Sequence, residues 1–348
     1  MLFWKSPHVH LTHAKKPSIL ALFSDSLLGD VRIRPYLNAL IARGVISNYD
    51  VVDRSMRLLG PRKSSQFTHI WCQRNVSTAQ MRFLKRHARA NIIYDFDDLL
   101  TAVPTFVMKT RRRTLKAIYW CLRHARAVTV ASGHMGTYLC EDIPDIAAKV
   151  VILQNGCAEA GVPRRERKKQ LIWASSDIPF FMRENPDFVS KLAALTNRLG
   201  YETILIGRFQ DVPTALFDRC RVIPHLDFVS YRELLRYFNG ALGLAPLPTE
   251  FHGVAQRYFD AKSDIKLVDF LSSRIIPILS TAIPYVKSDL YLPMLAGVDG
   301  DELLGKIEMC IADYDRISDY VDKTIHAGGV LRSRTFLEIS KALDHLFQ

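Results

Sequence analysis

The stretch ALGLAPLPTEFHGVAQRYFDAKSDIKLVDFLSSRIIPILS, residues 241–280, decides the fold of this chain. Apolar runs at 241–247 and 275–280 have the length and composition of buried strands, and the apolar residues of 265–271 recur at helical spacing. A helix that joins two buried strands is typical of a βαβ unit, whose strands run parallel. The N-terminal amides of such a helix face a cleft at the carboxyl ends of the strands.

Two lysines and a carboxylate accompany that helix. Lys262, Lys266 and Asp269 are spaced i, i+4 and i+7, so we expect them to share one polar face. Taken alone, the same spacing fits a solvated helix face that carries an ion pair. The rest of the sequence has to decide between a ligand site and such a surface.

The alternation of apolar runs with amphipathic helical patterns fills both halves of the chain. In the first half the strand-like runs are PSILALFSD, YDVVD, FTHIWCQR, NIIYDFD, AVTVAS and KVVILQNG, and a glycine, proline and charge-rich segment then interrupts the pattern. We therefore predict an α/β protein of two doubly wound, Rossmann-like domains, with a C-terminal helix that can pack back on the first domain. The boundaries are 1–156 for the N-terminal domain, 157–169 for a basic linker, 170–330 for the C-terminal domain and 331–348 for the last helix.

Composition narrows the function class. The 348 residues contain no apolar run long enough for a membrane span and no signal-peptide core at the start, so we expect a cytoplasmic protein. The six cysteines are scattered and lack metal-ligand spacing, which predicts reduced thiols and no metal site. The chain contains neither GxGxxG nor GxxxxGK[ST], which disfavours a dehydrogenase or an ATPase.

The charge is divided unevenly between the halves. Residues 1–169 hold 28 Lys and Arg against 12 Asp and Glu, whereas residues 170–348 hold 19 against 23. This asymmetry predicts that the first half meets a polyanion, which can be nucleic acid, an anionic membrane surface or a phosphorylated substrate.

Four blocks resemble those of bacterial glycosyltransferases with the two-domain GT-B fold. They are LGDVRIRPYLNAL at 28–40, YDFDD at 94–98, VVILQNG at 150–156 and LAPLPTEFHGVAQRYFDAKSDIKLVDFLSSRIIPILSTAIPY at 244–285. The last block is similar to the donor site of glycosyltransferase family 4, whose hallmark is a Glu-x7-Glu pair. Here Ala261 and Asp269 stand where the two glutamates are expected, so the block resembles a Lys-Ser variant of that site.

The resemblance implies two Rossmann-like domains that face each other across a cleft and a nucleotide-sugar donor, a UDP- or GDP-sugar. It also implies transfer with retention, no required metal and no other cofactor. The leaving diphosphate needs cations or helix amides, and the ribose needs a hydrogen-bond acceptor. The donor-side candidates on the helix and just before it are Lys262, Ser263, Lys266 and Asp269. Two further candidates follow strand ends, Arg208 for the phosphate and His225 for the base. For Arg208 an ordinary surface role is an equal alternative.

The acceptor side is expected in the first half. The catalytic candidates are the three clustered acids Asp95, Asp97 and Asp98, and the residues expected to meet acceptor or its phosphate are Gly29, Arg32, Arg34 and Arg74. The acids can serve as a general base or can hydrogen-bond the donor sugar. A helix cap at Asp98 and a divalent-cation pair are the alternatives.

A basic stretch from Lys109 to Arg126 follows these acids. Arginines and lysine alternate with apolar and aromatic residues, a pattern typical of a helix that binds a membrane interface. A solvated basic helix of the domain is the alternative. The membrane-contact candidates are Arg111, Arg112, Arg113, Lys116 and Trp120.

Together these features predict a glycosyltransferase on the inner face of the cell membrane. It would transfer a sugar from a nucleotide-sugar to a glycan or lipid-linked acceptor in bacterial surface polysaccharide or lipopolysaccharide assembly. The missing first glutamate leaves a catalytically silent partner subunit as one alternative, and the basic half leaves a nucleic-acid-binding protein as another. A sugar-nucleotide epimerase of the same fold is a third.

Overall fold

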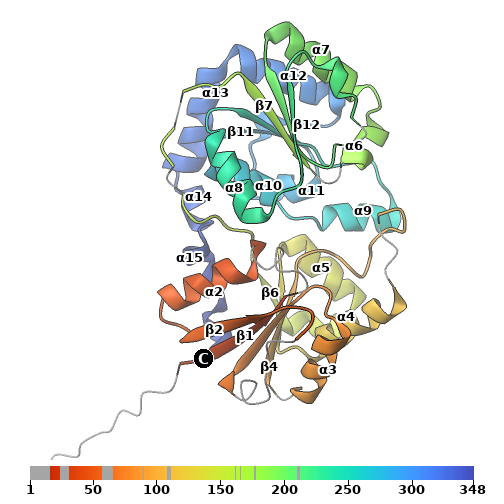
Figure 1. Cartoon of the computed structure of the whole chain (residues 1–348), viewed down its shortest axis with the longest axis vertical. Helices are drawn as coiled ribbons and strands as arrows, with labels where there is room; N and C mark the ends of the chain where they lie inside the picture. Colours follow the sequence, from red (N-terminus) through yellow and green to blue (C-terminus); the bar gives the residue numbers. More distant parts are fainter. Residues whose placement is uncertain are drawn as a thin grey trace, which may run out of the picture.

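The computed structural model describes residues 16–23, 31–56, 66–88, 90–107, 111–160, 162–164, 166–175, 178–209 and 212–348. Two six-stranded parallel sheets, each flanked by helices, make up the molecule (Figure 1). The predicted α/β fold with two doubly wound sheets is confirmed. None of the described helices is long and apolar enough to span a bilayer.

The N-terminal sheet has the strand order β2-β1-β3-β4-β5-β6. Its elements are β1 (Ser18–Leu22), α2 (Ile33–Ala42), β2 (Asn48–Val52), β3 (His69–Gln73), α3 (Thr78–Arg86), β4 (Asn91–Phe96), α4 (Arg112–His124), β5 (Ala127–Val130), α5 (Gly133–Asp142) and β6 (Val150–Ile152). All five residues of β3 are buried, because helices cover both faces of a parallel sheet. The helix α3 begins at a capping box, in which Ser77 and Gln80 each accept a hydrogen bond from the other's backbone amide.

The C-terminal sheet has the order β12-β11-β10-β7-β8-β9. Its strands are β7 (Gln170–Ser175), β8 (Glu202–Gly207), β9 (Cys220–Ile223), β10 (Leu242–Ala245), β11 (Ile276–Ser280) and β12 (Ala296–Gly297). Its helices are α6 (Ile178–Glu184), α7 (Phe188–Leu199), α8 (Phe228–Tyr237), α9 (Gly253–Asp260), α10 (Ile265–Ser272), α11 (Ile283–Val286), α12 (Gly300–Ala312), α13 (Tyr314–Val321) and α14 (Val330–Ser333). The stretch quoted first forms β10, α9, α10 and β11, and β10 pairs parallel with β11 as predicted.

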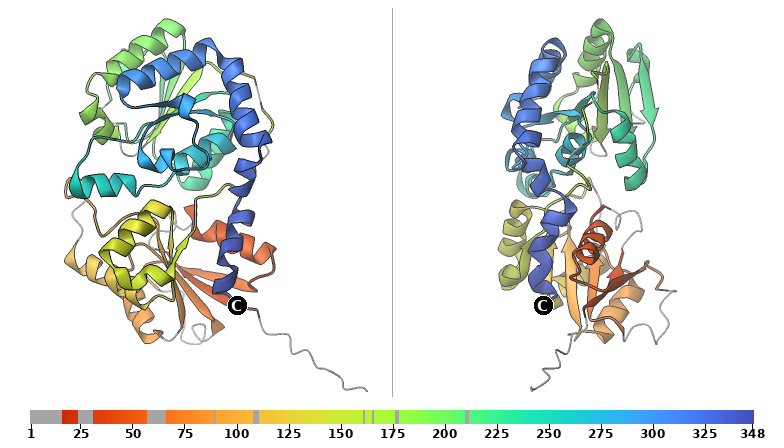
Figure 2. Two further views of the ribbon diagram at one scale, coloured as in Figure 1. Left: turned by 180° about the vertical axis from the view of Figure 1, so that it is seen from behind. Right: turned by 90° about the vertical axis from the view of Figure 1, so that its left-hand side faces the viewer.

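The end of the chain returns to the N-terminal sheet, where α15 (Phe336–Ile339) and the following turn run alongside α2 (Figure 2). Phe336 and Leu343 join the apolar cluster that contains Tyr36 and Trp71. At the junction the chain crosses between the sheets twice, and residues 157 and 335 form a parallel β-bridge there. The two crossings fix how the halves face each other.

Candidate functional site

A pocket lies between the two halves, at the carboxyl end of β8. Its volume is about 170 Å³, and its lining includes Val31 from the N-terminal half and Gly207, Tyr231, Lys266 and Asp269 from the C-terminal half. Gly207 has φ 123°, and a Cβ there would lie 2.5 Å from a backbone oxygen of β7, so no other residue fits without a shift. Parallel α/β sheets bind ligands at this edge.

Asp269 is the buried carboxylate of this pocket. Its side chain is 1% exposed, and Oδ1 accepts a 2.8 Å hydrogen bond from Arg232 Nε. The other oxygen, Oδ2, is buried and has no hydrogen-bond partner among the described residues. Since an unsatisfied buried acceptor is unfavourable, a ligand hydroxyl in the pocket would supply the missing bond. The alternative of an exposed ion pair at Asp269 is wrong.

The two lysines do not share one helix face with Asp269, because α10 begins only at Ile265 and Lys262 precedes it. Lys266 lines the pocket, where Nζ lies 3.3 Å from the Tyr231 hydroxyl and 4.5 Å from the centre of its ring. The prediction of a continuous polar stripe is therefore corrected: one lysine lies in the pocket, and the other turns toward the N-terminal half.

The N-terminal sheet contributes a charged group opposite the pocket, just after β4. Arg74 contacts Asp97 through Nε at 2.5 Å and Asp98 through Nη2 at 2.9 Å. Lys262 Nζ reaches Asp98 Oδ1 at 3.4 Å from the C-terminal half and contacts the Tyr258 hydroxyl at 3.0 Å. The Asp98–Lys262 pair thus joins the two halves across the cleft.

The two carboxylates are driven to different protonation behaviour. Burial raises the pKa of Asp97 above its ordinary value; Arg74 opposes this rise, and the nearby Asp95 and Asp98 add to it. Burial also acts on Asp98, but Lys262 and Arg74 outweigh it and hold the pKa of Asp98 below its ordinary value. Neighbouring acids whose pKa values are pushed apart are typical of sites that handle protons or charge.

Asp95 and Arg32 form a buried ion pair inside the N-terminal half. Their side chains are 0% and 2% exposed, and two nitrogens of the guanidinium each donate to the carboxylate at 3.0 Å. Thr129 donates to Asp95 at 2.7 Å, and Arg32 also donates to Asn155. The prediction that Asp95 is catalytic and Arg32 meets acceptor phosphate is therefore corrected, because both groups are used inside the domain.

The other candidates lie in varied surroundings. Ser263 is half-buried between Lys262 and α10. Arg208 is exposed where β8 ends, and His225 is exposed while lining the pocket. Arg34 is half-buried, with its guanidinium 5.7 Å from the centre of the Phe23 ring, and Gly29 lies outside the described residues.

The basic helix α4 uses its apolar side within the domain. Ile118, Cys121 and Leu122 are buried in the N-terminal core, so this side is not available to insert into a membrane. Arg111, Arg112, Arg113 and Lys116 are exposed. Trp120 is half-buried and stacks on His124 at 4.3 Å. The helix therefore presents charge, with one partly exposed indole.

Arg232 and Tyr231 were missed by the sequence reasoning. Both lie on α8, and together they hold Asp269 and Lys266 in the pocket. Arg232 also donates to the carbonyl of Gly156 where the chain leaves the N-terminal sheet. Nothing in the local pattern SYRELLRY distinguishes these residues, because their partners are on a later helix.

Neither a protein-family model nor a curated protein sequence matches the chain. Solved structures do match nearly its whole length. WaaG, a glycosyltransferase involved in lipopolysaccharide biosynthesis, has a TM-score of 0.62 at 11% identity over 95% of this chain and 99% of its own. A glycosyltransferase from Rickettsia africae has a TM-score of 0.60 at 11% identity and covers 96% of this chain and 98% of its own. Sucrose-phosphate synthase from Thermosynechococcus elongatus has a TM-score of 0.59 at 14% identity and covers 95% of this chain and 98% of its own. The fold is that of the GT-B glycosyltransferases.

Two further neighbours concern nucleotide-sugars. The β-glucosyltransferase of phage T4, solved with UDP-glucose, has a TM-score of 0.54 at 9% identity and covers 95% of this chain and 99% of its own. A Listeria monocytogenes protein assigned as a UDP-N-acetylglucosamine 2-epimerase has a TM-score of 0.58 at 8% identity and covers 94% of each chain. The same fold is thus found with a transferase and with an epimerase assignment.

Proposed function

We propose that this protein is a glycosyltransferase that moves a sugar from a UDP- or GDP-sugar to a glycan or lipid-linked acceptor. The observation that carries the proposal is the pocket at Lys266 and Asp269, opposite Asp97 and Asp98. One buried carboxylate oxygen of Asp269 has no hydrogen-bond partner in the described part of the chain. On one side of the reacting bond, the donor needs a cation for its diphosphate and a hydrogen-bond acceptor for its ribose hydroxyls. On the other side, the attacking hydroxyl of the acceptor substrate needs carboxylates.

In this proposal Lys262, Ser263 and Lys266 face the diphosphate. Departure of the diphosphate leaves negative charge, which the lysines and the N-terminal amides of α10 stabilise. Asp269 Oδ2 accepts a ribose hydroxyl, while Arg232 holds the carboxylate in place. The base lies toward exposed His225, and Arg208 is a further phosphate contact.

Asp97 and Asp98 lie on the acceptor side, where they bind the attacking hydroxyl or the transferred sugar. In this structure Asp98 forms an ion pair with Lys262 of the C-terminal half. A donor diphosphate competes for the same lysine, so donor binding would release the carboxylate for the acceptor. The retaining outcome is part of the proposal and follows from the resemblance to family 4.

The proposal is tested by thermal unfolding with UDP-, GDP-, ADP-, CMP- and dTDP-sugars. A ligand that binds only the native state at 100 times its Kd adds about 2.7 kcal/mol to the free energy of unfolding, so the matching donor should raise Tm by several degrees. If no nucleotide-sugar raises Tm, the protein is a silent subunit or a nucleic-acid-binding protein, and an oligonucleotide titration would separate these two.

Lys266→Ala is expected to lower kcat/KM for the donor about 10–150-fold, since the loss of a charge-assisted contact costs about 1.5–3 kcal/mol. Lys262→Ala should lower kcat/KM for the donor by a factor in the same range. Lys323→Ala removes an exposed lysine from the same half and serves as the matched control. Steady-state kinetics with a confirmed donor measure the effect, and wild-type kcat/KM in both the Lys266 and the Lys262 variant would refute the assignment of the lysines.

An epimerase is the second candidate, because the Listeria monocytogenes structure shares the fold. An epimerase converts the nucleotide-sugar without an acceptor, whereas a transferase leaves the free nucleotide when an acceptor is present. Nuclear magnetic resonance of the anomeric region, recorded on the donor with enzyme alone, separates the two. An isomerised nucleotide-sugar would favour the epimerase.

The proposed location is the inner face of the cell membrane, where exposed arginines at the start of α4 meet anionic lipid. Each Lys or Arg near such a surface contributes about 1 kcal/mol, and salt screens the attraction within about 8–10 Å at physiological ionic strength. Replacement of Arg111, Arg112 and Arg113 by Gln should therefore reduce flotation with phosphatidylglycerol vesicles at low salt. Equal flotation of the variant and the wild type would argue against this contact.

A further inference from the structure

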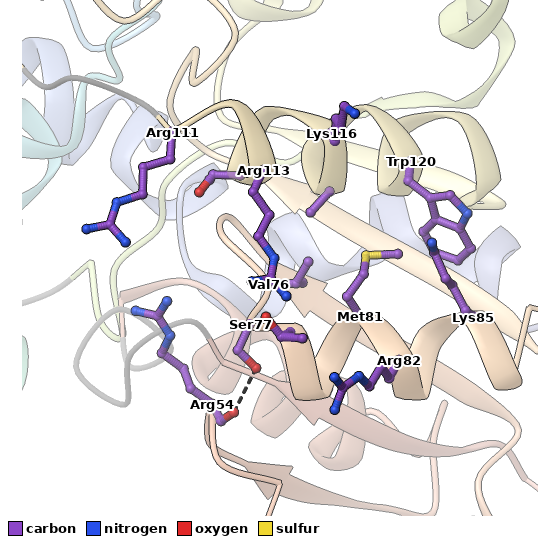
Figure 3. A pocket seen from close by; sticks show the side chains of 13 residues that line it. Arg54, Val76, Ser77, Met81, Arg82, Lys85, Arg111, Arg113, Lys116 and Trp120 are labelled. Atoms are coloured by element: carbon purple, nitrogen blue, oxygen red, sulfur yellow. Dashed lines mark hydrogen bonds between the residues drawn. The ribbon is translucent and has the colours of Figure 1, made fainter.

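A second cavity, of about 530 Å³, lies between α3 and α4, outside the cleft that separates the two halves (Figure 3). We call it the basic groove, because six cationic side chains line it: Arg54, Arg82, Lys85, Arg111, Arg113 and Lys116. The described lining contains no Asp or Glu, and none of these six forms an ion pair with a described residue. Like charges that converge on one concave space attract an anionic ligand.

The groove has an apolar component as well. Val76, Met81 and the indole of Trp120 belong to its lining. Figure 3 shows Arg111 and Arg113 toward one end of the groove and Trp120 with Lys85 toward the other. A mixed lining of this kind suits a ligand that has ring faces and several separated negative charges. The volume is also larger than a single phosphate fills.

The chain connects the groove closely to the acceptor-side carboxylates. Val76 and Ser77, which line it, follow Arg74 by two and three residues, and two residues of chain span at most about 7 Å. Arg74 itself contacts Asp97 and Asp98. The groove thus leads away from the reacting carboxylates along α3 and α4, on the opposite side of the cleft from the nucleotide pocket.

We propose that the basic groove binds the anionic part of the acceptor, a saccharide with at least two phosphate groups, while its reacting hydroxyl lies at Asp97 and Asp98. The inference rests on the proposed function and adds the class of acceptor. Arginine forks bind phosphate oxygens at two points, so several of them around one cavity select ligands by the spacing of their phosphates. A flat membrane surface does not fill a concave groove between two helices.

The test compares two triple variants that lose the same charge. The groove variant carries Arg82→Gln, Lys85→Gln and Arg113→Gln. The control carries Arg86→Gln, Arg123→Gln and Arg126→Gln, which remove exposed cations of α3, of α4 and next to α4 that do not line the groove. Calorimetry with a glucosamine disaccharide bearing two phosphate monoesters, and with the same disaccharide without phosphate, gives Kd for each protein.

We expect the groove variant to raise Kd for the bisphosphorylated disaccharide about ten-fold or more, the control variant to raise it less than about three-fold, and the unphosphorylated disaccharide to bind weakly to all three. Binding should also change the fluorescence of wild type more than that of Trp120→Phe, since Trp71 and Trp173 are fully buried. Equal weakening in both triple variants would overturn the proposal, because only the net charge would then matter.

Two other results would also overturn it. Phosphatidylglycerol vesicles that bind in a groove-dependent way, without disaccharide binding, would make the groove a lipid headgroup site. Single-stranded DNA that binds more tightly than the disaccharide would make it a nucleic-acid site. Thermal stabilisation by nucleotide-sugars is measured on the same proteins and should be unchanged in the groove variant. If nucleotide-sugars do not stabilise the wild type, the proposed function is refuted. The disaccharide measurements would then still show whether the groove binds a phosphorylated saccharide.

Discussion

Replacement of Asp95 by Ala is expected to lower the free energy of unfolding by about 3–5 kcal/mol, because it leaves the buried guanidinium of Arg32 without its counter-charge. Thr129 and Asn155 belong to the same network, and neither carries a charge that could replace the carboxylate. Urea unfolding with equal m-values measures the change. Asp50→Ala, which removes an exposed acid from β2, is the matched control and should change the free energy of unfolding by less than about 0.5 kcal/mol.

The double variant Asp95→Leu with Arg32→Met should recover part of that loss, since no uncompensated charge then remains in the core. This recovery separates a structural ion pair from a catalytic acid. An Asp95→Ala protein that unfolds like the wild type but transfers no sugar would contradict the structural assignment and return Asp95 to the catalytic group.

Replacement of Asp98 by Asn is expected to lower kcat about 10²–10⁴-fold while donor affinity is unchanged or tighter. The carboxylate is on the acceptor side and the donor pocket is across the cleft, so the main contacts of the nucleotide remain. The variant also removes the partner of Lys262 in the free protein, which leaves this lysine available to the diphosphate. Single-turnover kinetics and calorimetry with the confirmed donor measure the two effects separately.

Asp145→Asn, an exposed acid in the turn before β6, is the control and should behave as wild type. Loss of nucleotide binding in Asp98→Asn would contradict the division of labour between the two halves. Unchanged kcat, with binding intact, would remove Asp98 from the reacting centre. Asp97→Asn tests the same centre, but Asp97 is buried against Arg74, so its stability has to be measured beside its activity.

The edge of the sheet where the candidate site lies could be predicted from the sequence, but the roles of individual acids could not. YDFDD places three acids at the end of an apolar run, and β4 ends at Phe96, so Asp97 and Asp98 lie beyond the strand while Asp95 lies within it. Strand ends are uncertain by one or two residues when only the pattern is known. The buried acid and the two cleft acids therefore looked alike.

The sequence by itself determined the two parallel sheets, because apolar runs such as HIWCQ and LGLAPL need cover on both faces and helical patterns separate them. Only the tertiary structure decided which charges meet. Arg32 pairs with Asp95 and Lys262 with Asp98, 63 and 164 residues apart. The basic groove gathers cations from the end of β2, from α3 and from the start of α4. Local periodicity fixes the face on which a side chain lies, whereas a charge's partner depends on which elements pack together, and that is set by the whole core.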